Sequence, residues 1–300
     1  MHISMKVNIA GVEMKNPVTT ASGTFGSGKE YSEFVDLNKL GAVTVKGVAA
    51  EPWNGNPPPR IAETYGGMLN SIGLQNPGAK AFLDGDFKFL KNFDTKIIVN
   101  ICGHSVEEYC RVAEMISEAD MLELNISCPN LAEGGMAFGT KAQDVEKVVS
   151  AVKRRSKPPL IVKLSPNVAD IADIARAAEF AGADAVSLIN TLSGMKIDIK
   201  TRKPLLKNKT GGLSGPAVMP VAVRMVYQVY RAVKIPIIGM GGIRTGDDAV
   251  EFILAGASAV AVGTANFMNP RATVNVIDGI RNYMEKYRVA DINELIGACE

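Results

Sequence analysis

Eight short apolar runs, rich in β-branched residues, recur along the chain, and each ends in a small or polar residue. They are too short for buried helices and too continuously apolar for strands with one face in water. They therefore predict strands covered on both faces, as in a parallel sheet. The runs are PVTTASG (17–23), AVTVKG (42–47), IIVNICG (97–103), MLELNISCP (121–129), LIVKLSP (160–166), AVSLINT (185–191), PIIGMGG (236–242) and AVAVGTA (259–265).

Stretches with helical periodicity alternate with these runs. Eight β/α units in about 270 residues predict an α/β fold of the (β/α)8 barrel type, with residues 1–300 forming one domain. A doubly wound sheet is the alternative, but no G-x-G-x-x-G turn follows the first run. The clearest helical stretches are 106–117, 142–155, 169–181, 218–233, 247–255 and 272–287.

Two connections are too long for simple turns: 51–78 after the second run and 192–215 after the sixth. Long ordered loops in a compact domain are usually lids or binding loops. Both connections follow the carboxyl end of a predicted strand, which is the face where barrel active sites are built. A small hairpin is compatible with the sequence of the second connection.

Charge balance and cysteine spacing exclude several classes of protein. Thirty-three basic and 31 acidic residues give a net charge of +2, too small for a protein that gains affinity by neutralising nucleic-acid or membrane phosphates. The four cysteines show no CxxC or metal-finger spacing, so we expect a reducing compartment, no disulfide framework and no metal site. Without an 18-residue apolar run or an apolar export segment, the chain is expected to be cytoplasmic and to lack a membrane span.

Hydrogen-bonding side chains or glycines end nearly every predicted strand, and all of these ends meet at the carboxyl face of the barrel. A single strand that ends in Asn or Lys is ordinary turn chemistry, but the clustering indicates a binding site. The residues are Ser22, Lys46, Asn100, Asn125, Cys128, Lys163, Asn190, Thr191, Gly241, Gly242, Gly263 and Thr264.

The last two strand ends, GMGGIRTGDDA and VGTANFMNP, combine glycines with the start of a helix. Backbone N–H groups can approach an anion closely there, and the free N–H groups and dipole of a helix N-terminus attract phosphate. Tight turns are the alternative explanation for the glycines. The position of these two loops in a barrel favours a phosphate site.

Lys46 and Lys163 lie within apolar runs, and burying an ammonium is costly unless it is paired. Side chains alternate along a strand, so Glu123 and Asn125 share one face. If Asn125 and Lys163 point into the barrel, Glu123 does as well. We therefore predict that Glu123 lies inside the barrel and compensates the charge of Lys163 or Lys46. Snorkelling to the barrel mouth is the alternative, and it suits Lys46 better.

The inventory of acid–base groups is small. His2 lies in a terminus expected to fray, and His104 just precedes a helix, where a boundary role is as well supported as catalysis. A hydrolase with a catalytic histidine is therefore poorly supported. Cys128 follows the fourth run and precedes Pro129, which places its thiol in a loop over the barrel mouth. It can act there as a base or as a nucleophile, or be a small buried apolar side chain.

Nine motifs follow one another along nearly the whole chain. They are ASGTFG (21–26), TVKGV (44–48), GNPPPRIAET (55–64), GGMLNSIGLQNPG (66–78), ELNISCPN (123–130), VKLSPN (162–167), INTLSGM (189–195), GGLSGPA (211–217) and GMGGI (239–243). In this order and spacing they resemble the flavin subunit of class 1B dihydroorotate dehydrogenases.

The resemblance implies an FMN-containing barrel that oxidises (S)-dihydroorotate to orotate in pyrimidine (UMP) synthesis. It also implies that Cys128 is the base that takes the proton from C5, while hydride leaves C6 for flavin N5. Soluble members of the family use cysteine here and the membrane-attached class uses serine, so NISCPN agrees with the soluble class.

The same resemblance supplies two sets of contacts. The substrate contacts it implies are Lys46, Asn70, Ser71, Ile72, Gly73, Leu74, Asn125, Asn190 and Thr191. The FMN contacts it implies are Ala21, Ser22, Lys46, Gly47, Asn100, Asn125, Lys163, Ile189, Gly215, Gly241, Gly242, Gly263 and Thr264. The last four coincide with the phosphate loops, and a cation such as Lys163 near flavin N1 would stabilise the anionic reduced ring.

Reduced FMN must be reoxidised, yet the chain has neither a dinucleotide fingerprint nor cysteines spaced for a cluster. The resemblance implies a partner subunit that carries FAD and a [2Fe–2S] cluster and passes electrons to NAD⁺. The assembly it implies is a heterotetramer built on a homodimer of this chain. Alternatives are a fumarate-using class 1A homodimer, a dehydrogenase of a related dihydropyrimidine, and a phosphate-ligand binding or assembly subunit without activity.

Overall fold

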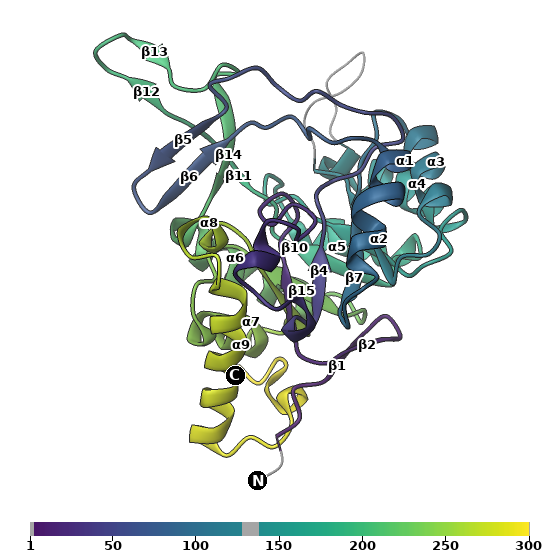
Figure 1. The fold of residues 1–300 in the computed structure, drawn as a ribbon, viewed down its shortest axis with the longest axis vertical. Helices are drawn as coiled ribbons and strands as arrows, with labels where there is room; N and C mark the ends of the chain where they lie inside the picture. Colours follow the sequence, from purple (N-terminus) through teal and green to yellow (C-terminus); the bar gives the residue numbers. More distant parts are fainter. Residues whose placement is uncertain (1–2, 128–137, 300) are drawn as a thin grey trace.

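Eight parallel strands form the centre of the molecule (Figure 1). The computed structural model describes residues 3–127 and 138–299, and the strand order is β3–β16–β15–β10–β9–β8–β7–β4. The predicted (β/α)8 barrel is confirmed, and each predicted run ends two to four residues beyond its strand, in the loops of the carboxyl face. The strands are β3 Val18–Thr20, β4 Ala42–Thr44, β7 Lys96–Ile101, β8 Met121–Asn125, β9 Leu160–Lys163, β10 Ala185–Leu188, β15 Ile237–Met240 and β16 Ala259–Val262.

Threonines close the barrel where β3 and β4 meet. The Thr20 hydroxyl donates to the Thr44 carbonyl oxygen at 3.1 Å and accepts from the Thr44 backbone N–H at 2.9 Å. The hydroxyls of Thr19 and Thr44 lie 3.0 Å apart, and the Gly41 N–H donates to the Val18 carbonyl oxygen at 3.1 Å. Side-chain hydroxyls therefore replace part of the backbone ladder at this seam.

Amphipathic helices cover the outside of the sheet where the periodicity predicts them. Four valines of α4, from Val145 to Val152, are buried at the i, i+3, i+4, i+7 spacing of one helical face. This face packs on the barrel and fixes the helix against it. The long helices are α3 Val106–Met115, α4 Ala142–Lys153, α5 Ile171–Phe180, α6 Met219–Tyr230, α7 Gly246–Leu254 and α9 Ala272–Tyr287.

A further helical segment between β4 and β7 was not predicted from the sequence. It consists of α1 Ala79–Phe82, a π-helical turn η3 Leu83–Phe87 and α2 Lys88–Leu90. Gly85, which has low helix propensity, interrupts the apolar pattern there. The remaining short elements are η1 Tyr31–Glu33, η2 Leu37–Lys39, η4 Phe138–Thr140, η5 Pro216–Val218, α8 Ala265–Met268 and η6 Ile292–Leu295.

The two long connections pair with each other in a four-stranded antiparallel sheet, which we call the roof sheet and which projects from one end of the barrel (Figure 1). Its order is β11–β14–β6–β5, and Asn70 lies opposite Gly212, a separation of 142 residues. The small hairpin in the second connection is confirmed as β12–β13. The bounds are β5 Ile61–Thr64, β6 Gly67–Asn70, β11 Leu192–Met195, β12 Ile197–Asp198, β13 Lys203–Pro204 and β14 Thr210–Ser214.

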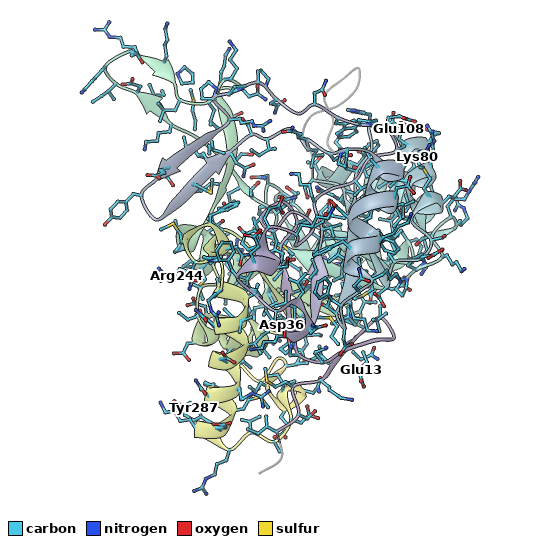
Figure 2. The ribbon with its side chains drawn as sticks, viewed as in Figure 1. Glu13, Asp36, Lys80, Glu108, Arg244 and Tyr287 are labelled. Atoms are coloured by element: carbon cyan, nitrogen blue, oxygen red, sulfur yellow. The ribbon has the colours of Figure 1, made fainter. Side chains whose placement is uncertain are left out.

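A second unpredicted feature is an amino-terminal hairpin of β1 Val7–Ile9 and β2 Val12–Met14. Its turn residues Ala10 and Gly11 have φ values of 53° and 87°, as a two-residue hairpin turn requires. Charged side chains of both signs, Glu13, Asp36 and Lys80 among them, are exposed on the surface of the molecule (Figure 2). Among the described residues, no helix has the length and apolarity needed to cross a bilayer.

Candidate active site

A cavity opens between the carboxyl ends of the barrel strands and the roof sheet, and we call it the mouth cavity. Its walls enclose about 1080 Å³, a volume that includes solvent at the opening. The predicted site residues that line it are Ala21, Ser22, Lys46, Asn70, Ile72, Leu74, Asn125, Lys163, Ile189, Asn190, Thr191, Gly215, Gly241, Gly242, Gly263 and Thr264.

Four buried polar side chains on adjacent strands form one cluster: Asn100 of β7, Glu123 of β8, Lys163 of β9 and Ser187 of β10. We call it the Glu123 cluster. Glu123 Oε2 accepts from Asn100 Nδ2 at 2.6 Å, and Oε1 accepts from Ser187 Oγ at 2.7 Å. Lys163 Nζ lies 3.6 Å from Glu123 Oε2. The prediction that Glu123 lies inside the barrel and compensates Lys163 is confirmed.

Two groups of this cluster keep hydrogen-bonding capacity that the described residues do not use. The Lys163 ammonium has its ion pair but no hydrogen bond within those residues, and its side chain lines the mouth cavity. The Oδ1 atom of Asn100 is buried without a hydrogen-bond partner among them. Because buried polar groups normally find partners, both groups indicate a polar ligand at this end of the cavity.

Two amide side chains, Asn125 and Asn190, form a second polar edge of the cavity. Asn125 Oδ1 accepts from Asn190 Nδ2 at 3.3 Å, and the Tyr109 hydroxyl donates to the backbone carbonyl oxygen of Asn125 at 2.6 Å. Asn190 Oδ1 in turn accepts from the Thr191 backbone N–H at 2.8 Å. These bonds hold the amides in place, and amides offer a small ring both donors and acceptors.

The loops after β15 and β16 supply backbone donors. The N–H groups of Gly242, Gly263 and Thr264 donate no hydrogen bond within the part of the chain that the structure describes, and all three residues line the mouth cavity. At the start of α7, Thr245 and Asp248 form a capping box in which each side chain accepts from the other residue's backbone N–H. No residue of α7 lines the mouth cavity, so the loop N–H groups are the backbone donors on this part of its wall.

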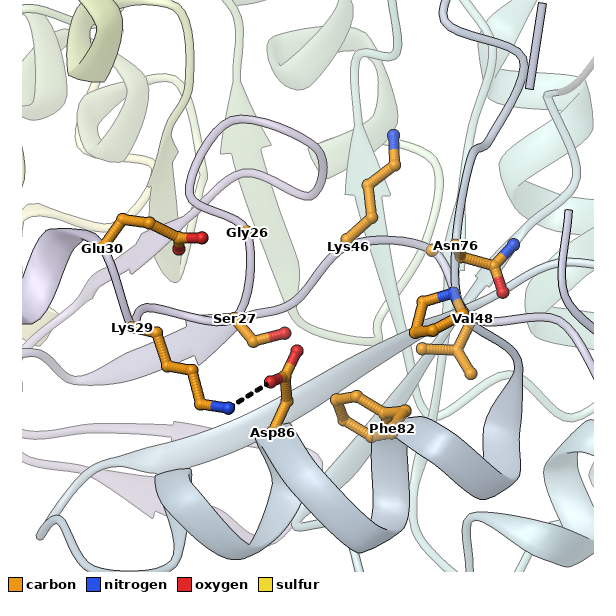
Figure 3. Close-up of a pocket in the computed structure, with 11 residues that line it drawn as sticks. Gly26, Ser27, Lys29, Glu30, Lys46, Val48, Asn76, Phe82 and Asp86 are labelled. Atoms are coloured by element: carbon orange, nitrogen blue, oxygen red, sulfur yellow. Dashed lines mark ion pairs between the residues drawn. The ribbon is translucent and has the colours of Figure 1, made fainter. Parts of the chain in front are cut away.

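Lys46 is shared with a second, smaller cavity (Figure 3). The Lys46 side chain points away from the Lys29–Asp86 ion pair of that cavity, whose atoms lie 3.0 Å apart. Its Nζ atom would lie 3.4 Å from a Cβ added at Gly23, which itself lines the mouth cavity. The positive charge of Lys46 therefore belongs to the mouth cavity.

Four predicted site residues do not line the mouth cavity: Gly47, Ser71, Gly73 and Asn100. Gly47 lines the smaller cavity, and Asn100 is fully buried. Gly73 has a φ of 74°, and an added Cβ would lie 2.7 Å from the Asn56 nitrogen, so this glycine is required by loop packing. The assignment of these four residues as ligand contacts stays a prediction.

The predicted base, Cys128, lies outside the described residues. The other acid–base candidate, His104, packs its ring against Trp53 with centroids 4.1 Å apart and planes tilted by 33°, and its backbone N–H donates to the Glu108 carboxylate at 2.6 Å. These contacts give His104 the boundary role before α3. The described residues contain no group of three or more His, Cys, Asp and Glu side chains that could hold a metal ion.

Sequence reasoning missed eight residues that line the mouth cavity. Met240 and Ala261 could have been found, because alternation along paired strands places them on the same face as Lys163. Ile61, Met68 and Ser214 come from the roof sheet, and no local signal reveals where that sheet lies. The full set is Gly23, Thr24, Ile61, Met68, Ser214, Met240, Ala261 and Phe267.

Comparisons with known proteins agree with one another. A family model described as dihydroorotate dehydrogenase matches residues 4–284. A protein of Alkaliphilus oremlandii is 66% identical over 296 residues, which cover 98% of each chain. One of Lachnoclostridium phytofermentans is 65% identical over 297 residues, 98% of this chain and 99% of the relative. One of Thermoanaerobacter pseudethanolicus is 54% identical over 298 residues, 99% of each. All three are named "Dihydroorotate dehydrogenase B (NAD(+)), catalytic subunit".

Proposed function

Because this chain belongs to the dihydroorotate dehydrogenase family, we propose that it oxidises (S)-dihydroorotate to orotate in pyrimidine synthesis, with FMN bound in the mouth cavity. The observation that carries the proposal is the polar lining of that cavity. Its lysines, amides and unbonded backbone N–H groups match the two kinds of ligand that the reaction needs.

The residues present fit FMN. The backbone N–H groups of Gly242, Gly263 and Thr264 suit a phosphate group, which takes several hydrogen bonds at once. The Lys163 ammonium and the Asn100 side-chain oxygen Oδ1 suit the polar edge of a flavin ring, which offers acceptors and a donor. When bound, FMN supplies the acceptor for the hydride that leaves substrate C6.

Residues of the chain bind and orient the substrate. The amides of Asn70, Asn125 and Asn190 offer donors and acceptors to the two amide-like edges of the dihydroorotate ring, and Lys46 offers a point charge to its carboxylate. Met68 of the roof sheet lines the opposite wall and helps to exclude water.

Cys128 is the base in this proposal. Its thiolate removes the proton from substrate C5, and the charge of Lys46 favours the thiolate over the thiol. The motif NISCPN begins with Asn125, the last residue of β8, which lines the cavity. The loop therefore starts beside the substrate edge.

Electrons leave through a partner subunit in this proposal. The printed name of the relatives, a catalytic subunit linked to NAD⁺, supports a partner of this kind. We propose that the partner carries FAD and a [2Fe–2S] cluster, and that two copies of each chain assemble in the cytoplasm. Co-purification at native expression followed by a cofactor inventory tests this. FMN with FAD and iron supports the complex, whereas FMN alone supports a self-sufficient homodimer that uses another acceptor such as fumarate.

Anaerobic mixing tests the reaction itself. Dihydroorotate is expected to bleach the flavin absorbance of the FMN-loaded chain, and dihydrouracil, which lacks the carboxylate, is expected to leave it unchanged. Bleaching by dihydrouracil alone would reassign the substrate to another dihydropyrimidine. A chain that binds no FMN would refute the proposal.

Substitution of Cys128 tests the base. Cys128→Ala is expected to lower kcat by about 10²- to 10⁴-fold, the usual contribution of a general base. Cys128→Ser should retain part of the activity with its pH optimum shifted upward, because a hydroxyl is harder to deprotonate than a thiol. Cys110→Ala is the matched control, since burial raises the pKa of that α3 thiol and keeps it protonated. Equal rates for Cys128→Ala and the parent at every pH would show that Cys128 is not the base.

A further inference from the structure

Resting on this proposed function, we infer that Glu123 is a positioning residue that holds the Lys163 ammonium at the cavity wall and sets the reduction potential of the bound flavin. Glu123 lies behind Lys163, away from the cavity lining, so it acts through the lysine. Nothing in the reaction itself requires a carboxylate in the barrel wall, and this is why its presence needs an explanation.

Removing this carboxylate from water lowers the stability of the fold unless its interactions compensate the loss of hydration. The side chains of Glu123 and Lys163 are 3% and 6% exposed. Transfer of a charge into such a site costs several kcal/mol, and an apolar pair of the same volume is often as stable. Stability alone therefore gives little reason for an ion pair here.

The hydrogen bonds that fix the Glu123 carboxylate come from neutral side chains and not from Lys163. Each oxygen of Glu123 has one short hydrogen bond, from Asn100 at 2.6 Å and from Ser187 at 2.7 Å. The Lys163 ammonium, at 3.6 Å, is close enough for attraction but too far for a hydrogen bond. Its N–H donors therefore remain available to a ligand, while attraction to the carboxylate holds the ammonium in position.

Strand register assembles the cluster. Asn100 pairs with Glu123 across β7 and β8, while Asn125, Lys163 and Ser187 pair across β8, β9 and β10. Glu123 is thus one layer deeper in the barrel than Lys163, and both share the inner face. A negative charge under a positive one forms a dipole whose positive end faces the ligand.

This dipole has an electrochemical consequence. The reduced flavin carries negative charge, which Lys163 stabilises and Glu123 opposes. If Glu123 is replaced by neutral glutamine while Lys163 stays protonated, the reduced form is favoured. We expect the affinity for reduced FMN relative to oxidised FMN to rise about tenfold in Glu123→Gln, which is about 30 mV upward for a two-electron couple.

The experiment measures the midpoint potential of FMN in the full-length parent and variants at pH 6.5. Glu123→Asp keeps the charge and is expected to change the affinity ratio less than threefold. Ser187→Ala, the matched control, removes one hydrogen bond to the same carboxylate and should also stay within threefold. A role in packing alone would lower the thermal stability of these variants without moving the potential of any of them.

An unchanged or lower potential in Glu123→Gln, with FMN bound, overturns the inference and leaves the proposed function intact. If Glu123→Gln does not fold, unfolding of Lys163→Met and of the double variant Lys163→Met/Glu123→Gln provides a second test that needs no flavin. The double variant should be the more stable, because it leaves no unpaired buried charge. Equal stability of the two would also overturn the pairing, whereas failure of the parent to bind FMN refutes the proposed function instead.

Discussion

The barrel strands and the roof strands bury their residues differently. Every residue of β9, β10, β15 and β16 is buried, whereas β5 and β11 alternate between more and less exposed positions. Helices cover the barrel strands outside and side chains cover them inside, but the roof strands keep one side towards water. In the roof, Ile61 is 57% exposed, although it also lines the mouth cavity.

The barrel wall and the roof wall of the mouth cavity therefore differ in how firmly they hold their side chains. A charge inside the barrel, such as Lys163, is fixed by buried neighbours on both adjacent strands. The roof residues are held by pairing between distant segments and by few buried side chains, of which Leu69 is one. We therefore expect the barrel wall to set the chemistry and the roof to open more readily for ligand exchange.

The largest effect expected from this comparison is on stability. Leu124→Ala in β8 removes a fully buried side chain and should lower the free energy of unfolding by about 2–5 kcal/mol. Leu213→Ala in β14 truncates a half-buried side chain in the roof and should cost about 1 kcal/mol. Denaturant unfolding of the two variants measures both values. Equal losses would show that the roof is as tightly integrated as the barrel.

An intermediate effect is expected where the roof touches the barrel. A Cβ at Gly212 would lie 2.0 Å from Thr191 Oγ1, so Gly212→Ala must displace Thr191 from the cavity wall. Overpacking should cost about 1–3 kcal/mol, and the KM for dihydroorotate should rise about tenfold. Gly85→Ala is the control, because its added Cβ meets nothing within 4 Å. An unaltered KM in Gly212→Ala would show that Thr191 does not contribute to substrate binding.

The smallest effect is expected at the β12–β13 hairpin, which lies between β11 and β14 in the sequence but outside the roof sheet. Hydrogen bonds from the Lys200 N–H and then from the Thr201 hydroxyl lower the pKa of Asp198. A carboxyl whose folded pKa is lowered stabilises the turn above the ordinary aspartate pKa of about 3.9, and this stabilisation is lost as pH falls through the folded value. Asp198→Ala should therefore lower the hydrogen-exchange protection factor of the Lys200 amide without changing kcat, and the parent should lose the same protection on acidification, once its rate is corrected for the pH dependence of intrinsic exchange. A fall in kcat would connect this hairpin to the reaction.

Part of the site could be predicted because it depends on local periodicity. Strand alternation placed Glu123 on the face of Lys163, and the ion pair confirms it. The same alternation would have identified Met240 and Ala261. It did not show that Asn100 would donate to Glu123, because that contact joins two strands whose relative register no single run contains.

Other parts could not be predicted because their partners are distant in the sequence. Glycines and prolines in 51–78 and 192–215 obscure the short strands, and β6 becomes a strand only by pairing with β14. The seam between β3 and β4 depends on the hydroxyls of Thr19, Thr20 and Thr44, which the sequence does not distinguish from ordinary strand residues. The helical segment from α1 to α2 was missed because Gly85 breaks its pattern.

The sequence by itself determined the eight-fold β/α repeat and the polar strand ends, because a strand covered on both faces is continuously apolar until it leaves the core. Only the tertiary structure decided which polar groups meet. Register brings Asn100, Glu123, Lys163 and Ser187 into contact, and long-range pairing places the roof sheet over the mouth cavity. The physical reason is that burial is a property of each segment, whereas contacts and cavities belong to segments that meet only when the chain is folded.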